Sequence, residues 1–134
     1  MGMYTELVVC ANIKNVPEVI AVLKYMVDFF ESSVGQPQLP NHPLFTTDRW
    51  RMLFHGSSYY FVPRAIAKLE YDDIGDYWCL ITRADLKNYD SEIEKFIDWI
   101  RPYVDSENEM FAYSRYEETR EPTIYYTKST EELL

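Results

Sequence analysis

The chain has 134 residues, of which 47% are hydrophobic and 16% aromatic, and its formal net charge is −9. This length fits a single domain, 1–134, and the composition excludes intrinsic disorder because enough apolar surface is available to build a core. The acid excess argues against direct binding to nucleic acid or to an anionic membrane, since phosphate groups would repel it.

The first elements along the chain are a predicted strand and a predicted helix. Apolar and polar side chains alternate in residues 5–14, which is typical of a strand with one buried face. Residues 15–32 carry apolar side chains at helical spacing, and Asn15 and Glu18 have the spacing of a capping box. The helix is expected to end at Gly35.

Residues 35–57 are predicted to form a proline-containing loop with a short helical insertion. Prolines at 37, 40 and 43 favour an extended loop over 35–45, and residues 46–54 have the composition of one or two helical turns. Trp50, Leu53 and Phe54 in this insertion are expected to close a gap in the core.

The remainder of the chain predicts two or three strands, a second helix and two more strands. Asp90 or Ser91 is the predicted cap of that helix, and residues 129–134 are expected to be a frayed tail. The predicted strands are 58–62, 65–72, 77–86, 109–118 and 123–128, and the second helix is 89–104.

This order of elements indicates an α+β fold. A βαββαβ core with additional strands is the ferredoxin-like pattern, in which an antiparallel sheet has two helices on one face. Strand alternation then places Lys68, Arg83 and Arg115 together on the other, open face. The further polar side chains expected on that face are Asn12, Lys14, Glu70, Asp85, Tyr113 and Glu117.

The acid excess is concentrated near the end of the chain. Residues 89–134 sum to −7, whereas 1–48 sum to −3 and 49–88 to +1. Carboxylates on and after the second predicted helix could form an acidic ridge that contacts a basic protein, and a merely solvated helix face is the alternative that stays open. The ridge residues are Glu92, Glu94, Asp98, Glu107 and Glu109.

The stretch RWRMLFHGSSYYF at 49–61 is a second candidate, for a small anionic or nucleotide-like ligand. Arginines bind anions and aromatic rings offer stacking surfaces, although a core role for these aromatic residues is the favoured interpretation. The candidate ligand-binding residues are Arg49, Trp50, Arg51, Tyr60, Arg83, Tyr113 and Arg115.

Signals for catalysis, metals and cofactors are sparse. His55 with Ser57 or Ser58 could be a base–nucleophile pair, but no glycine-framed elbow accompanies it. Three aspartates within 72–76 fit a hairpin turn better than a cation site. Neither histidine has metal-ligand spacing and no phosphate-binding glycine motif occurs, so no metal, cofactor or enzymatic site is predicted.

The two cysteines and the first residues bear on the compartment. Cys10 and Cys79 lack the spacing of a zinc site or a redox pair, so buried, reduced thiols are expected. The opening MGMYTEL lacks the basic and apolar regions of a signal peptide, and no apolar run is long enough to span a bilayer. These features favour a cytoplasmic protein.

Three segments resemble a family of small bacteriophage and prophage proteins with no assigned activity. They are LPNHPLFTTDRWRMLFHGSSYYF, LEYDDIGDYWCLITRADLKNYDSEIEKFIDWIRPYV and YSRYEE with PTIYY, and the likeness runs over about 3–126. The resemblance implies a protein made in an infected bacterium. By analogy it implies a non-enzymatic binding protein, such as an acidic inhibitor of a host nuclease or defence factor. Its partner would be a basic host protein, and a homodimer is left open.

Overall fold

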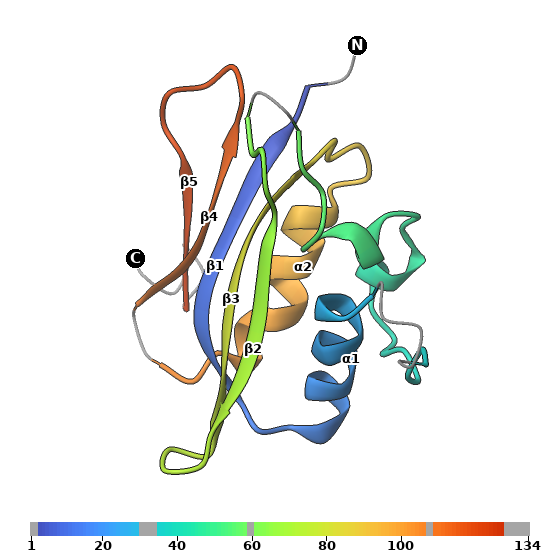
Figure 1. Cartoon of the computed structure of the whole chain (residues 1–134), viewed down its shortest axis with the longest axis vertical. Helices are drawn as coiled ribbons and strands as arrows, with labels where there is room; N and C mark the ends of the chain where they lie inside the picture. Colours follow the sequence, from blue (N-terminus) through green and yellow to red (C-terminus); the bar gives the residue numbers. More distant parts are fainter. Residues whose placement is uncertain (1–2, 30–34, 59–60, 107–108, 128–134) are drawn as a thin grey trace.

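The computed structural model describes residues 3–29, 35–58, 61–106 and 109–127. These residues form five strands, two α-helices and three short 3-10 helices (Figure 1). The strands are β1 (Thr5–Lys14), β2 (Ile66–Asp72), β3 (Tyr77–Leu86), β4 (Met110–Tyr116) and β5 (Thr123–Tyr126). The α-helices are α1 (Pro17–Val27) and α2 (Glu92–Ile100), and the 3-10 helices are η1 (Pro43–Thr46), η2 (Trp50–Met52) and η3 (Arg101–Tyr103).

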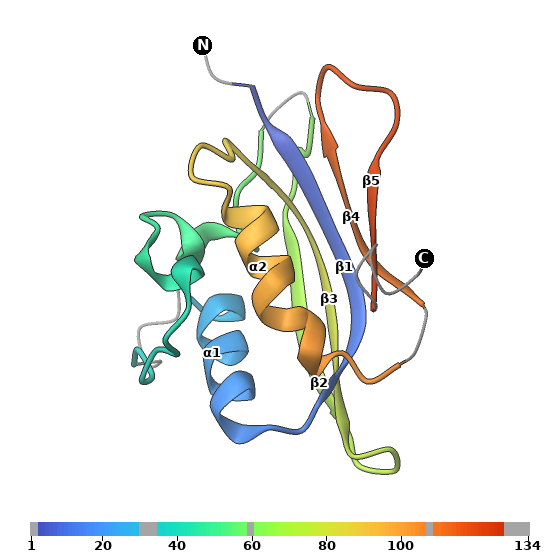
Figure 2. The ribbon, with the colours of Figure 1, turned by 180° about the vertical axis from the view of Figure 1, so that it is seen from behind.

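The five strands form one antiparallel sheet in the order β2-β3-β1-β4-β5. β1 and β3 pair over their whole lengths, from Thr5 opposite Leu86 to Lys14 opposite Tyr77. Both helices cover the same face of this sheet, as Figures 1 and 2 show from opposite sides. The predicted α+β class with two helices on one face is therefore confirmed, and no described helix packs on the other face.

The core lies between the sheet and the two helices. Alternation in β1 buries Leu7, Val9 and Ile13 completely, because every second side chain of a strand points to the same face. The helices cover these residues with apolar stripes, and each fully buried aliphatic side chain contributes about 1.5–3 kcal/mol of transfer free energy. The stripes contain Val19, Ile20, Leu23 and Met26 in α1 and Ile93, Phe96, Ile97 and Ile100 in α2.

The insertion between α1 and β2 completes this core. Trp50 is 1% exposed, and its ring centroid lies 5.0 Å from that of Phe45. Leu53 and Phe54 are fully buried, and the Phe54 ring packs edge-on against Phe96 of α2. The expectation that this segment closes a gap in the core is confirmed.

Residues 43–46 differ from the predicted extended loop, since they form the 3-10 helix η1. Pro43 occupies the first position of this helix, where the missing N–H of proline costs no hydrogen bond. The His42 ring caps it, because its Nδ1 accepts the Leu44 N–H at 3.0 Å. A ring nitrogen as cap has no simple sequence signature.

The predicted strand at 58–62 is wrong for its described residues, since Ser58, Phe61 and Val62 belong to no strand. Residues 59–60 lie outside the described residues. The chain instead crosses the end of the sheet beyond β2, where the Gly56 carbonyl accepts the Asp85 N–H at 3.0 Å. This contact occupies the edge of β3 that a further strand would need.

The helix α1 begins at a different cap from the one predicted, whereas α2 begins at Ser91, one of its two predicted caps, without the expected side-chain bond. The N-cap of α1 is Val16, because the Asn15 side chain bonds to Asp76 and to the Trp78 indole N–H. Ser91 is the N-cap of α2 but has a φ of 54° and no capping side-chain bond. The side chain that bonds the first turn of α2 is that of Asn88.

An irregularity in β4 sets which side chains reach the core. The register with β5 shifts between Met110 and Ala112, which is the mark of a β-bulge. Phe111 and Ala112 are 2% and 3% exposed and both belong to the core, whereas Met110 is 54% exposed. The bulge therefore buries two successive residues and leaves Met110 outside.

Candidate binding surfaces

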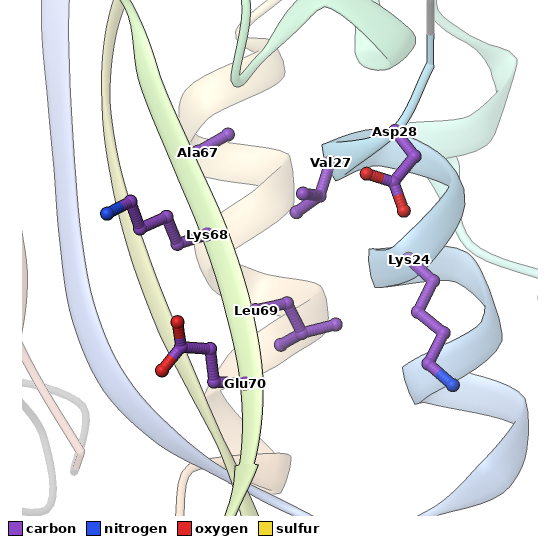
Figure 3. A pocket seen from close by; sticks show the side chains of 7 residues that line it. All are labelled: Lys24, Val27, Asp28, Ala67, Lys68, Leu69 and Glu70. Atoms are coloured by element: carbon purple, nitrogen blue, oxygen red, sulfur yellow. The ribbon is translucent and has the colours of Figure 1, made fainter. Parts of the chain in front are cut away.

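The face of the sheet opposite the helices, called the open face below, is built from alternate residues of all five strands. Figure 3 shows the alternation in β2, where Ala67 and Leu69 point toward the helix layer while Lys68 and Glu70 point away. The pairing registers align these residues in rows across the strands. One row is Ile66, Arg83, Val8, Tyr113 and Ile124, and the next is Lys68, Ile81, Cys10, Met110 and Tyr126.

The centre of the open face is apolar. Ile81 and Ile66 are 44% and 43% exposed, and Met110, Ile124 and Tyr126 are exposed as well. Large apolar side chains in a contiguous, exposed group are unusual unless a partner covers them. The apolar band, as it is called below, consists of Val8, Cys10, Ile66, Ile81, Met110, Tyr113, Ile124 and Tyr126.

Sequence reasoning missed this band because it searched the second face only for polar side chains. The signal was present in β1, where Val8 and Cys10 are apolar on the face opposite Val9, and in β3, where Ile81 continues it. The bulge that leaves Met110 on the outside had no such signal.

Two of the predicted cations of the open face, Arg83 and Arg115, are brought together at one end of the sheet, whereas Lys68 lies in the next row opposite Ile81. Glu6 of β1 lies opposite Arg115 on one side and Asp85 on the other. The Arg83 Nε lies 2.9 Å from a Glu6 carboxylate oxygen, and the Arg115 Nε lies 3.5 Å from the other oxygen. Glu6 is only 2% exposed, and the two arginines neutralise its charge, as a buried carboxylate requires.

Asp85 is the second buried carboxylate at this end. The Ser58 hydroxyl donates to one of its oxygens at 2.6 Å, while the other oxygen is buried without a hydrogen-bond partner among the described residues. Burial raises the pKa of the Asp85 carboxyl, and the hydrogen bonds from Ser58 and the Val62 backbone oppose that shift. This carboxylate fastens Ser58 and Val62 to the sheet.

Both cysteines lie on the open face, contrary to the prediction that they are buried. Cys10 is exposed and Cys79 is partly buried, and both are free thiols. They are diagonal neighbours on β1 and β3, because Cys10 pairs with Ile81 and Asn12 pairs with Cys79. Burial raises the pKa of the Cys79 thiol, and the neighbouring Cys10 adds to this shift.

The predicted ligand-binding residues separate into two groups on opposite sides of the sheet. Arg83, Tyr113 and Arg115 lie on the open face. Trp50 is part of the core on the helix side, so its ring is not available to stack on a ligand. Tyr60 lies outside the described residues.

The two arginines of the 49–61 stretch are occupied by local contacts. Arg49 stacks on the Tyr89 ring and donates to the Lys87 carbonyl at 3.1 Å. The Arg51 guanidinium stacks on the Trp50 ring, at the edge of the core, and donates to the Gln36 side chain at 2.7 Å. The structure therefore does not assemble Arg49, Trp50 and Arg51 into one pocket with the arginines of the open face.

The predicted acidic ridge is only partly a common surface. Glu92 is fully buried and accepts the Asp90 N–H, so it must be removed from the ridge. Its chain position at the start of α2, where it satisfies a backbone donor, is the physical reason. Glu109 lies beside Cys10 and Met110 at the other side of the sheet, and Glu107 lies outside the described residues.

Glu94 and Asp98 remain as exposed carboxylates on one side of α2, four residues apart. Both oxygens of Glu94 accept from the Asn88 amide, and one oxygen of Asp98 lies 2.9 Å from the His42 ring. Asp98 keeps a side-chain exposure of 78%, so these contacts orient the carboxylate without covering it.

His55 and Ser58, candidates for a base–nucleophile pair, have other contacts. The Nε2 of His55 lies 2.7 Å from the Met26 carbonyl, whereas the Ser58 hydroxyl donates to Asp85. The aspartates of 72–76 are turn residues, since Asp72 accepts the backbone N–H groups of Ile74 and Gly75. Within the described residues no group of three or more potential ligands could hold a metal ion.

A groove of about 370 Å³ lies between the end of α1 and the edge strand β2 (Figure 3). Val27, Ala67 and Leu69 give it apolar walls, and Lys24 and Asp28 stand at its rim. The two rim charges are of opposite sign and both are exposed, so the groove has no preference for an ionic ligand.

Comparison with known proteins identifies no relative: no protein-family description, curated protein or solved structure matches this chain. The resemblance to bacteriophage proteins therefore stays a prediction.

Neither α1 nor α2, nor any other helix in the described part of the chain, has the length and hydropathy needed to cross a bilayer.

Proposed function

We propose that this protein is a non-enzymatic binding protein that contacts a basic protein partner through its acidic surface. The observation that carries the proposal is the distribution of charge. Within the five strands, four cations and four carboxylates occupy open-face positions, so the formal charges of these strand residues cancel. They are Lys14, Lys68, Arg83 and Arg115, with Glu6, Glu70, Asp72 and Asp85.

The net charge of −9 is therefore carried by the remaining surface, which includes the helices and loops. Glu94 and Asp98 on α2 are the predicted contact residues that remain exposed on one surface. Because they stand on a helix and are oriented by Asn88 and His42, they offer a partner a fixed pair of carboxylates. The negative electrostatic field of this surface speeds association with a positively charged surface.

The partner class that we propose is a basic host protein, such as a nuclease or a defence factor, met in the cytoplasm of an infected bacterium. This class follows from the phage resemblance and the acid excess together. We further infer that β1, α1, β2, β3, α2 and β4 form a ferredoxin-like unit. The order β2-β3-β1-β4 and the antiparallel pairing support this assignment, with β5 as an added edge strand.

The test uses the immobilised full chain to capture proteins from a bacterial lysate, followed by purification of any captured protein and calorimetric titration. We expect a captured protein with a basic surface whose affinity falls at least tenfold for the Glu94→Lys, Asp98→Lys double variant. The matched control is Glu118→Lys, Glu121→Lys, which makes the same charge change at exposed residues near the β4–β5 connection.

The control separates a specific contact from general attraction. Equal losses for the two double variants would show that only net charge matters, and unchanged affinity for the α2 variant would remove the proposed contact. Far-ultraviolet circular dichroism of each variant checks that the fold is kept.

A further inference from the structure

We propose that the open face binds a second copy of this chain, which forms a twofold-symmetric dimer with the two sheets facing each other. The proposal rests on the apolar band and on the charge balance of the open face, so it is independent of the acidic contact proposed above.

The apolar band has the layout of an interface core. Five of the nine large hydrophobic side chains that are exposed among the described residues belong to it. They come from four different strands and lie in two adjacent rows that also hold Arg83 and Lys68, with Glu70, Asp72 and Lys14 further along the same face. An apolar centre with a charged rim is the usual anatomy of a protein–protein interface.

The charge distribution favours a copy of the same chain as the occupant. Two copies with a net charge of −9 repel each other over most of their surfaces. The strand residues of the open face are the exception, because their cations and carboxylates are equal in number, and Glu109 and Glu117 lie at the ends of β4. A twofold interface brings the same patch together from both sides, so the exposed cations of one copy can pair with Glu70 and Asp72 of the other, whereas Glu6 and Asp85 are buried and bonded within each chain.

A basic partner is a poorer match for this face. It would gain little from the acid excess, most of which lies elsewhere, and it would meet Lys68 and Arg83 beside the apolar band. Arg83 is already committed to Glu6, and 45% of its side chain remains exposed. The face therefore discriminates against a strongly basic protein in a way that it does not against a second copy.

The size of the face is adequate for a dimer. Strands of four to ten residues, about 3.3 Å per residue and about 4.8 Å apart, give a five-stranded face of roughly 500 Å². Two such faces contribute on the order of 1,000 Å², which is the lower end of the area buried in specific interfaces. This area treats each face as flat, so side chains that project from it would add to the buried surface.

The exposed thiol of Cys10 on the open face also supports a dimer. Free cysteine is among the most buried residue types, yet Cys10 is exposed in the middle of the central strand β1. A second copy laid on the apolar band would cover it. Cys10 therefore reports on whether the face is open or covered in solution.

The first test is the molecular mass of the full chain by sedimentation velocity over a range of concentrations. We expect a species of twice the 16.0 kDa chain mass, and we expect Ile81→Lys to raise the dimer dissociation constant by roughly tenfold or more. The matched control is Ile74→Lys at the β2–β3 turn, where the side chain is 96% exposed. Both lysine substitutions change the net charge by the same amount, so a difference between the two variants reports on the position of the side chain and not on overall charge.

The second test needs no disruptive variant and uses a Cys79→Ser chain that keeps only Cys10. The rate at which the aromatic disulfide reagent DTNB modifies Cys10 should fall as the protein concentration rises, because the dimer covers this thiol. A rate independent of concentration, together with a monomer mass, would overturn the proposal. A monomer is also the result expected if a different protein or another segment of the chain covers the face. Equal dimerisation of Ile81→Lys and Ile74→Lys would overturn the assignment to the open face.

Discussion

At the scale of single residues, Gly56 joins the insertion to the sheet by backbone contact alone. Its carbonyl accepts the Asp85 N–H at 3.0 Å, and a Cβ added to Gly56 would lie 2.0 Å from the Asp85 carbonyl oxygen. That atom belongs to the backbone of β3, so it cannot move aside as the end of a flexible side chain could. The requirement for glycine here arises from close approach, since no glycine among the described residues has a positive φ.

Gly56→Ala is therefore expected to lower the free energy of unfolding by about 1–3 kcal/mol, the usual cost of overpacking. The measurement is chemical denaturation monitored by tryptophan fluorescence. The control is Gly35→Ala, because an added Cβ at Gly35 meets nothing within 4 Å and should change stability by less than about 0.5 kcal/mol. Equal effects of the two substitutions would mean that residues 56 and 85 pack less closely than in the structure.

At the scale of elements, the start of α2 shows how a cap can move away from its expected residue. Ser91 has the right residue type, but its φ of 54° is in the left-handed region and its side chain makes no cap bond. The Asn88 Oδ1 accepts the Ile93 N–H at 3.0 Å, and its amide donates to both oxygens of Glu94. Asn88 thus satisfies one backbone donor of the first turn and orients a carboxylate near it.

Asn88→Ala is expected to lower the free energy of unfolding by about 1 kcal/mol, as is typical of a lost cap. Ser91→Ala should have little effect because the hydroxyl bonds nothing in the first turn. Ser91→Gly should leave stability unchanged or raise it, since glycine accepts a positive φ without the steric cost that other residues meet. Thermal denaturation of the three variants provides the comparison, and a larger loss for Ser91→Ala than for Asn88→Ala would restore the cap that the sequence predicts.

The same elements show which features of the fold can be predicted from the sequence. The strands β1 and β3 and the apolar stripes of both helices were predictable, because alternation and helical spacing depend only on neighbouring residues. The cap at Asn88, the loss of a strand at 58–62 and the bulge at Met110 depend on contacts with distant segments, such as Gly56 with Asp85. Local patterns cannot contain such contacts.

The candidate surfaces divide in the same way. Alternation correctly placed Lys68, Arg83 and Arg115 on one face. The burial of Glu92 was not predictable, because residue type alone favours exposure of a carboxylate and only the Asp90 N–H explains the exception. The separation of Trp50 from the open face likewise needed the position of the insertion on the helix side.

At the scale of the whole molecule, charge and apolar surface are segregated. The strand residues of the open face are charge-balanced and surround the apolar band, and the rest of the chain carries the net charge of −9. The two proposed contacts therefore occupy different surfaces and depend on different forces. A dimer formed through the open face would leave the acidic surface of each copy free for a partner.

This segregation predicts opposite salt dependences for the two contacts. The Debye length falls from about 30 Å at 0.01 M salt to about 8 Å at 0.15 M, so added sodium chloride screens both repulsion and attraction between exposed charges. Dimerisation should strengthen severalfold over this range, because the repulsion between two acidic chains is reduced while the apolar contact is kept. Binding of a basic partner should weaken, because the attraction that drives it is reduced.

Sedimentation velocity of the full chain and calorimetric titration of its partner, each repeated across this salt range, measure the two dependences. The Glu118→Lys, Glu121→Lys variant is the control for dimerisation, since each substitution replaces a negative charge with a positive one at an exposed residue and so raises the net charge by two units. Its dimer should respond less to salt than the unmodified dimer does. If dimerisation weakens with salt instead, ion pairs rather than the apolar band hold the two copies together, and the acidic and open faces do not have the separate roles assigned to them.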